Sequence, residues 1–431
     1  MIILKNGLVV DPATSFCEIS DVAIVGEVVK ELGKDLEIGL LEEKYGEKAE
    51  VIDCTGCIVG PGLVDVHVHF RDPGFEYKED IESGAKAAAR GGVTSVILMA
   101  NTKPVVDNED TLSYVLDKGA KTDIHVYSCA SITKGLKGAE LVDMEGLLAA
   151  GAAGFTDDGI PILSSDMVHK AMEESARLKT VLSFHEEDPA YISNNGVNNG
   201  SASEYFGIGG SNRKAEITMI ERDIKIAQET GAIVNFQHVS TKEAVELIRA
   251  AKKGPNGENI HAEATPHHIS MTEEDVKVYG ACAKMNPPLR TEEDRQAIIL
   301  GIVDNTLDLI ATDHAPHAAF EKEKDITEAP SGIIGIETSL STSYNALVRA
   351  KRMDILQLFC KMSYNPSKLY KINAGELAID RTADIVIFDP NRTYIFEKSL
   401  SKSFNSPLKN REIMGDVVTT ISSGKVIYKN M

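Results

Sequence analysis

The chain has 431 residues, of which 45 are basic and 65 acidic, so its formal net charge at pH 7 is −20. A hydrophobic fraction of 43% is sufficient for a large core and excludes a mainly disordered protein. A strongly acidic chain without a basic cluster is a poor candidate for binding nucleic acid or an anionic membrane, and no apolar run reaches the roughly 18 residues of a transmembrane helix.

Both ends of the chain have the pattern of short strands separated by turns. Apolar runs alternate with Gly, Asp and Ser at 2–4, 22–25 and 51–52, and again at 383–390, 417–421 and 426–428. Because chain ends often lie close together, we predict that residues 1–58 and 375–431 form one small composite β domain, similar to a β-sandwich.

The middle of the chain alternates apolar strand patterns with amphipathic helical ones. The predicted strands are 63–69, 95–99, 124–128, 153–156, 180–185, 233–238, 260–264 and 307–312, and helical spacing is clearest at 81–90, 165–178, 214–230 and 243–252. Eight such units predict an α/β fold, a (β/α)8 TIM-like barrel over residues 59–374. A doubly wound open sheet is the alternative, but no Gly-rich phosphate loop follows the first strand.

Polar residues follow the predicted strands at the end where a barrel carries its catalytic groups. In chain order they are His67, His69, Arg71, Asn101, Asp157, Asp158, His185, His238, His267, His268, Asp313, His314 and His317. Imidazole together with carboxylate is the ligand set that zinc and related ions prefer. Three other histidines, at strand starts or in a helix, are assigned no such function: His125, His261 and His169.

His67 and His69 are two residues apart in one strand, so both rings can enter the same lumen and bind one ion. Four histidines and two aspartates exceed the ligand number of one tetrahedral ion. They suit two ions that share a bridging carboxylate and a bridging hydroxide.

Several motifs together resemble the amidohydrolase superfamily and, more narrowly, the long (type I) dihydroorotases. They are PGLVDVHVHFR at 61–71, MANT at 99–102, FTDDG at 155–159, MNPPLR at 285–290, DHAPH at 313–317 and PSGI at 330–333. The resemblance covers essentially the whole chain. It implies reversible cyclisation of N-carbamoyl-L-aspartate to (S)-dihydroorotate and water, a step of de novo pyrimidine (UMP) biosynthesis.

The resemblance also implies a pair of zinc ions bridged by an aspartate and a hydroxide. Related hydantoinases use a carboxylated lysine after the fourth strand, and this chain has none there. Asp158 is chosen over Asp157 as the bridge because its interval to His185 matches the family pattern. One zinc is then held by His67, His69, Asp158 and Asp313, and the other by His185, His238 and Asp158. Asp313 is expected to act as the general acid and base.

Substrate recognition is expected at the same mouth. In the family pattern Arg71, Asn101 and His317 bind the carboxylate outside the reacting bond, and the planar fork of arginine suits that task. The full set expected to contact substrate is His69, Arg71, Asn101, Asn286, His317, Ser331 and Gly332. His314 is expected to be structural, while His267 and His268 are candidates for supporting a ligand.

Two other functions are compatible with the superfamily. One is a different cyclic amidohydrolase, such as a hydantoinase, dihydropyrimidinase or allantoinase, and the missing lysine argues against it. The other is a non-catalytic homologue that acts as a structural partner of aspartate transcarbamoylase, and the presence of all six ligands argues against that. A homodimer and an association with the transcarbamoylase are both compatible with the resemblance.

The remaining expectations concern location and loops. The N-terminus lacks a basic region followed by an apolar one, and the six cysteines are scattered, so we expect a cytoplasmic protein without a signal peptide or disulfide framework. The loops at 194–210 and 320–325 are candidates for a lid over the site.

Overall fold

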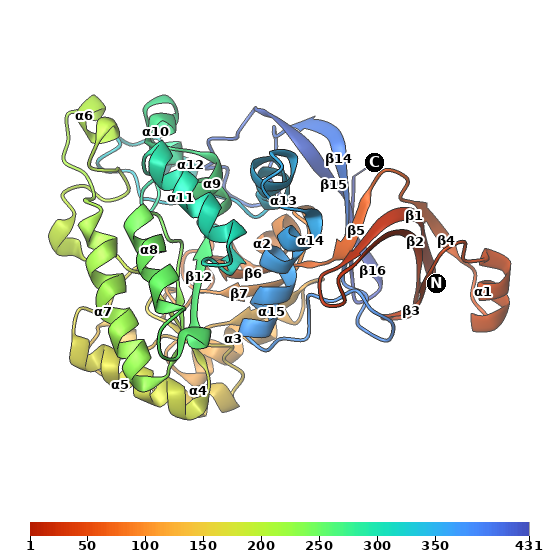
Figure 1. The fold of residues 1–431 in the computed structure, drawn as a ribbon, viewed down its shortest axis with the longest axis horizontal. Helices are drawn as coiled ribbons and strands as arrows, with labels where there is room; N and C mark the ends of the chain where they lie inside the picture. Colours follow the sequence, from red (N-terminus) through yellow and green to blue (C-terminus); the bar gives the residue numbers. More distant parts are fainter. Residues whose placement is uncertain (431) are drawn as a thin grey trace.

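In the computed structural model, which describes residues 1–430, one sheet contains strands from both ends of the chain. The strands lie in the order β16-β15-β14-β5-β1-β2-β3, and β4 pairs with β1. Their bounds are β1 Ile2–Asp11, β2 Phe16–Val25, β3 Val28–Gly33, β4 Glu50–Asp53, β5 Ile58–Pro61, β14 Ile385–Ile395, β15 Glu412–Ser422 and β16 Lys425–Lys429. Antiparallel pairing of β14 with β5 joins the two halves, and both chain ends lie on the right in Figure 1.

The first strand is longer than its apolar pattern predicted. β1 continues past Leu4, but its register against β2 shifts between Leu4 and Gly7, where Asn6 has a φ of 62°. This bulge interrupts the alternation of apolar residues, so the sequence pattern ends early. A Cβ on Gly7 would lie 2.5 Å from Val59 Cγ2, which explains why the bulge carries a glycine.

The middle of the chain contributes eight parallel strands in two sheets, which confirms the predicted α/β class. They are β6 Leu63–Val68, β7 Val93–Leu98, β8 His125–Ser128, β9 Phe155–Thr156, β10 Val181–Phe184, β11 Ile233–Phe236, β12 Ile260–Ala264 and β13 Leu309–Ile310. The first sheet has the order β6-β7-β8 and the second β13-β12-β11-β10-β9. Isolated parallel bridges connect the sheets at both edges, between Ala130 and Phe155 and between Val68 and His314.

Helices follow most of these strands and cover them from outside. Their bounds are α1 Ile38–Tyr45, α2 Ile81–Arg90, α3 Glu109–Gly119, α4 Met144–Ala149, α5 Ser165–Leu178, α6 Ser201–Phe206, α7 Lys214–Thr230, α8 Lys242–Ala251, α9 Pro266–Ser270, α10 Glu273–Tyr279, α11 Glu292–Val303, α12 Ala319–Lys322, α13 Ser339–Ser343, α14 Ile355–Phe359 and α15 Asn365–Leu369. Helices α5, α7, α8 and α11 pack side by side in sequence, on the left in Figure 1.

Helix α2 illustrates why these segments are helical. It begins after Asp80, whose side chain accepts a hydrogen bond from the Ser83 amide in a capping box. Its apolar residues at helical spacing, including Ile81, Ala85 and Ala88, are buried in the main core against the strands. Burying this stripe supplies most of the helix's stability, as is usual for a helix of ten residues.

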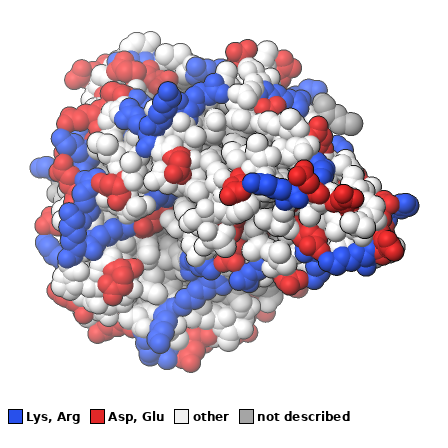
Figure 2. Space-filling view, turned by 45° about the vertical axis from the view of Figure 1, so that its right-hand side comes forward, with Lys and Arg blue, Asp and Glu red and all other residues white. Residues whose placement is uncertain are grey.

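No helix within residues 1–430 is both long and apolar enough to cross a membrane. On the face shown in Figure 2, basic side chains are interspersed with acidic ones.

Candidate metal centre

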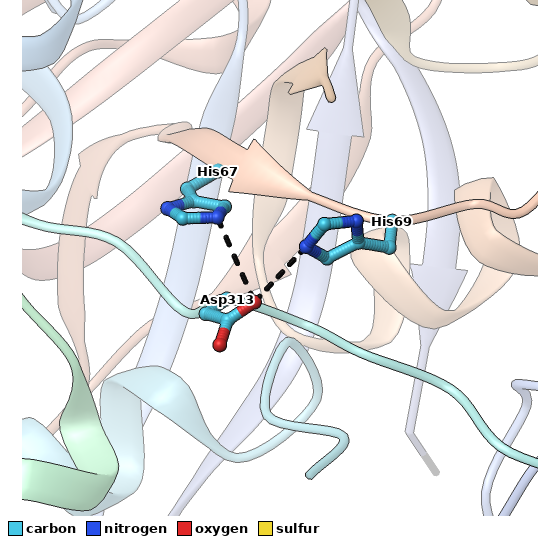
Figure 3. Close-up of side chains that lie close together, drawn as sticks. All are labelled: His67, His69 and Asp313. Carbon is cyan, nitrogen blue, oxygen red and sulfur yellow. Dashed lines mark hydrogen bonds and ion pairs between the residues drawn. The ribbon is translucent and has the colours of Figure 1, made fainter. Parts of the chain in front are cut away.

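The six predicted ligands come together at the carboxyl ends of the parallel strands. His67 lies in β6 and His69 directly follows it, and both rings point toward Asp313, which follows β13 (Figure 3). His69 Nε2 is 3.0 Å from Asp313 Oδ1, and His67 Nε2 is 3.6 Å from the same oxygen. One ligand atom from each of the three residues lies within 4.8 Å of the others, close enough to hold one ion.

Asp158 lies between this group and the other two histidines. Its Oδ1 is 3.5 Å from His67 Nε2 and 3.6 Å from His185 Nδ1, and its Oδ2 is 3.4 Å from His69 Nε2. His67, Asp158 and His238 form a second group of ligand atoms within 4.8 Å of one another. His185 Nδ1 faces His238 Nε2 at 2.9 Å, so the cluster extends to both predicted histidines of the second site.

Asp157 lies beside the cluster but its carboxylate points elsewhere. Asp157 Oδ1 accepts hydrogen bonds from the backbone amides of Ile132 and Thr133 at 2.7 and 3.0 Å, and its other oxygen bonds the Thr133 hydroxyl. It therefore connects the loop after β8 to the end of β9. Of the two adjacent aspartates, Asp158 is the one that faces the histidines.

Electrostatics in the cluster favour added positive charge. Burial by itself lowers the pKa of His67, but the charges of Glu263 and Asp158 outweigh it and raise the pKa well above its usual value. The pKa of His185 rises to about 10, because Asp158 and Glu187 outweigh the effect of burial. The buried His67 Nε2 has no hydrogen-bond partner among residues 1–430. An unpartnered nitrogen among carboxylates and imidazoles fits a divalent metal ion, whose charge would offset the carboxylates.

Two glutamates that the sequence analysis did not select support these histidines. Glu263 Oε2 is 3.2 Å from His67 Nδ1, and Glu187 Oε2 is 3.3 Å from His185 Nε2. A carboxylate behind a ligating histidine fixes its tautomer and its ring orientation. The sequence does contain one indication of Glu263, because it is a charged residue within the mostly apolar strand β12. A charged residue in a strand can equally be an ordinary surface residue, so the pattern alone did not select it.

Three residues of the site have backbone angles that side chains rarely adopt. The φ angles of Arg71, His238 and Asp313 are 61°, 34° and 48°. All three lie two or three residues after the end of a parallel strand, where the chain turns at the mouth. Strained backbone of this kind is concentrated at functional sites, because folding alone gains nothing from it.

The proposed substrate-binding residues form a second group beside the ligands. Arg71 Nε donates to the Pro316 carbonyl at 3.2 Å, and Arg71 Nη2 lies 3.5 Å from His317 Nε2. The same nitrogen of His317 is 2.9 Å from the Ser331 carbonyl oxygen. Lys78, which the sequence analysis did not select, places its Nζ 3.3 Å from His317 Nδ1. Two cationic side chains therefore flank one imidazole.

Asn101 and Asn286 differ in what they contact. Asn101, which is predicted to bind the substrate carboxylate, has its Oδ1 3.0 Å from His69 Nδ1, and its Nδ2 donates to Asp158 Oδ2 at 2.9 Å. Its amide thus orients two predicted ligands. The buried Oδ1 of Asn286 has no hydrogen-bond partner within residues 1–430. Gly196, in one predicted lid loop, approaches it so closely that an added Cβ would lie 3.1 Å from that oxygen.

The remaining histidines near the mouth have separate surroundings. His314 Nδ1 accepts a hydrogen bond from the Gly335 amide at 3.2 Å, away from the cluster. His268 Nε2 lies 3.1 Å from the Pro287 carbonyl oxygen, so it supports the loop that carries Asn286 instead of a metal ligand. His267 is buried, and neither ring nitrogen has a partner in the described part of the chain.

The family model and the relatives found by sequence agree on the family. Residues 56–244 match a family model described as "Dihydro-orotase-like". The chain is 49% identical over 428 residues to the dihydroorotase of Clostridioides difficile strain 630, covering 99% of this chain and 100% of the relative. It is 45% identical over 432 residues to that of Streptococcus pneumoniae serotype 4, with both chains fully covered.

Among solved structures, the L-hydantoinase (dihydropyrimidinase) from Arthrobacter aurescens superposes with a TM-score of 0.86 at 24% identity, covering 99% of this chain and 96% of that one. The D-hydantoinase (dihydropyrimidinase) from Thermus sp. gives a TM-score of 0.84 at 21% identity, covering 100% of this chain and 95% of that one. At these identities the likeness concerns the fold alone.

Proposed function

The chain belongs to the dihydroorotase family of cyclic amide hydrolases, as its motifs suggested, and we propose that it interconverts N-carbamoyl-L-aspartate and (S)-dihydroorotate in pyrimidine biosynthesis. The observation that carries the proposal is that two groups of side chains meet at the carboxyl ends of the parallel strands. Buried histidines and aspartates can hold metal on one side, and on the other the Arg71 guanidinium lies beside His317, where the resemblance expects the substrate carboxylate.

The architecture belongs to the same proposal. We assign residues 59–374 to a closed (β/α)8 catalytic barrel and residues 1–58 and 375–431 to one composite β domain. The parallel bridges from Val68 to His314 and from Ala130 to Phe155 support closure. The pairing of β5 with β14 supports a domain made from both ends.

Two zinc ions per chain fit this donor set. His67, His69, Asp158 and Asp313 would hold one, and His185 and His238 with Asp158 the other. When bound, such ions supply a nucleophile at neutral pH by lowering the pKa of water, and they polarise the amide carbonyl. Glu263 and Glu187 keep the far nitrogens of His67 and His185 engaged.

The chain's own residues supply the proton transfer and the recognition. In hydrolysis a water oxygen attacks the ring amide carbonyl while Asp313 takes its proton. Asp313 then delivers that proton to the ring nitrogen as the carbon–nitrogen bond breaks. In cyclisation the steps reverse, and water is lost. Arg71 binds the carboxylate that does not react, with His317 beside it. Burial together with Arg71, Lys78 and Lys322 lowers the pKa of His317 to about 2, so its ring stays neutral.

The direct test is a substrate panel measured with metal content on the same sample. We expect turnover of dihydroorotate and carbamoyl-aspartate, with hydantoin, dihydrouracil and allantoin at least about a hundredfold poorer in kcat/KM. Preference for one of the uncharged rings would favour a different cyclic amidohydrolase. Metal present without any turnover would favour the non-catalytic homologue. A homodimer, an association with aspartate transcarbamoylase and a cytoplasmic location stay predictions.

A further inference from the structure

A segment from outside the barrel reaches its mouth. Residues 399–406 run between β14 and β15, in the part of the chain that belongs to the composite sheet. The buried Glu337 accepts a hydrogen bond from the Leu400 amide at 2.8 Å, and the buried Glu79 accepts one from the Lys402 amide at 3.2 Å. Two carboxylates of the barrel thereby fix the backbone of this segment.

Asn405, near the end of the segment, forms hydrogen bonds at the mouth of the barrel with both atoms of its side-chain amide. Its Oδ1 accepts from the His317 amide at 3.0 Å, and its Nδ2 donates to the carbonyls of Ala315 at 2.9 Å and Gly332 at 3.0 Å. Its own carbonyl accepts from the Ile334 amide at 3.0 Å. With a relative exposure of 3%, the residue has no water to replace these partners.

These bonds join the two segments that carry proposed substrate contacts. His317 lies on the first segment and Ser331 and Gly332 lie on the second, and the His317 ring meets the Ser331 carbonyl at 2.9 Å. The two segments are tightly packed, because a Cβ on Gly332, whose φ is 146°, would lie 2.8 Å from His317 Cδ2. A displacement of either segment therefore moves the other.

We propose that Asn405 is a positioning residue that sets the distance between His317 and the Ser331–Gly332 backbone and thereby determines affinity for the carboxylate-bearing substrate. It acts through those groups and contacts no predicted metal ligand. The inference rests on the proposed function and assigns to the C-terminal segment a part in recognition. The composite sheet then contributes to the site as well as to the fold.

The test is Asn405→Asp in the full-length, metal-loaded enzyme. Aspartate keeps an acceptor for the His317 amide but places an oxygen against the Ala315 and Gly332 carbonyls. We expect KM for dihydroorotate to rise about tenfold or more while kcat stays within about threefold. Metal content should equal that of the wild type. A loss of folded protein would instead lower kcat and leave KM unchanged.

Asn345→Asp is the matched control. The Asn345 amide donates to the Met414 carbonyl at 2.7 Å, which also links the barrel side to the composite sheet but at a half-buried position. Its KM should stay at the wild-type value. If Asn405→Asp does not fold, Asn405→Ser gives the same measurement with a neutral side chain. An unchanged KM in the folded variant, or an equal rise in the control, overturns the proposal. Failure of the wild type to process dihydroorotate would overturn the proposed function instead.

Discussion

Replacing Glu263 with glutamine tests how the protein orients His67, one of the proposed metal ligands. Glu263 Oε2 is 3.2 Å from His67 Nδ1, and its Oε1 accepts from Asn235 Nδ2 at 2.7 Å. Both Glu263 and His67 have no exposed surface. A carboxylate only accepts hydrogen bonds, so it keeps a proton on Nδ1, and Nε2, which faces Asp158 and Asp313, is the nitrogen left to bind a metal ion.

Glutamine has nearly the same shape but a different hydrogen-bond pattern. If its oxygen keeps the bond from Asn235, its amide nitrogen faces His67 Nδ1, which must then accept. The ring proton moves to Nε2, the atom that would bind metal. The negative charge that favours a cation nearby is lost in either orientation. Removing such a supporting partner typically lowers metal affinity about 10- to 100-fold, which corresponds to about 1.4–2.7 kcal/mol.

The measurement is a zinc titration of metal-free protein in competition with a chromogenic chelator. Glu216→Gln is the matched control, because Glu216 is also a buried carboxylate, and it accepts from the Ser240 and Thr241 amides at 2.7 and 2.8 Å outside the cluster. Thermal unfolding of the metal-free variants separates a loss of fold from a loss of affinity. Wild-type zinc affinity in Glu263→Gln, or an equal loss in Glu216→Gln, would refute this account of His67.

Four further variants test the other assignments. Asp313→Ala should lower kcat by about 10²- to 10⁴-fold while most of the metal stays bound, and near-normal turnover would exclude the proton transfer. Arg71→Met should raise KM for carbamoyl-aspartate about 10- to 100-fold yet affect an uncharged cyclic imide much less, and equal effects would remove Arg71 from carboxylate binding. Asp158→Ala should reduce the zinc content per chain. Asp157→Ala should keep the zinc but lower the free energy of unfolding by about 2 kcal/mol, because two buried amides lose their acceptor. If Asp157→Ala loses the zinc and Asp158→Ala keeps it, the roles assigned to the two aspartates must be exchanged.

The parallel strands and the clustering of the proposed ligands were predictable because both depend on the order of residues along each strand. His67 and His69 at a strand end show which side of the strand faces the lumen and which end of the strands carries the site. Parallel strands then bring distant residues such as Asp313 to that same end. The short strands were less predictable. β13 has two residues where six were expected, and the chain turns three residues after its end, at Asp313, whose φ is 48°.

The supporting residues could not be predicted because their partners are distant in sequence and their chemistry is common. Glu263 in a strand resembles any charged residue until the fold places it behind His67. Asn405 lies in a stretch of serines and lysines whose composition suggests a loop, and only the structure joins it to His317. The choice between Asp157 and Asp158 depended on a resemblance in spacing, whereas here the direction of each carboxylate separates them.

The net charge of −20 raised the question of how an acidic chain binds a dianionic substrate. The main charges acting on His317 differ in sign from the net charge of the chain. Burial comes first among the causes that lower the pKa of His317 to about 2, and the charges of Arg71, Lys78 and Lys322 add to it, so the charges facing that ring are mainly positive. Zinc held by the histidines and aspartates would add further positive charge to the site. The overall charge therefore describes the outer surface, and a few buried groups determine which charge the site accepts.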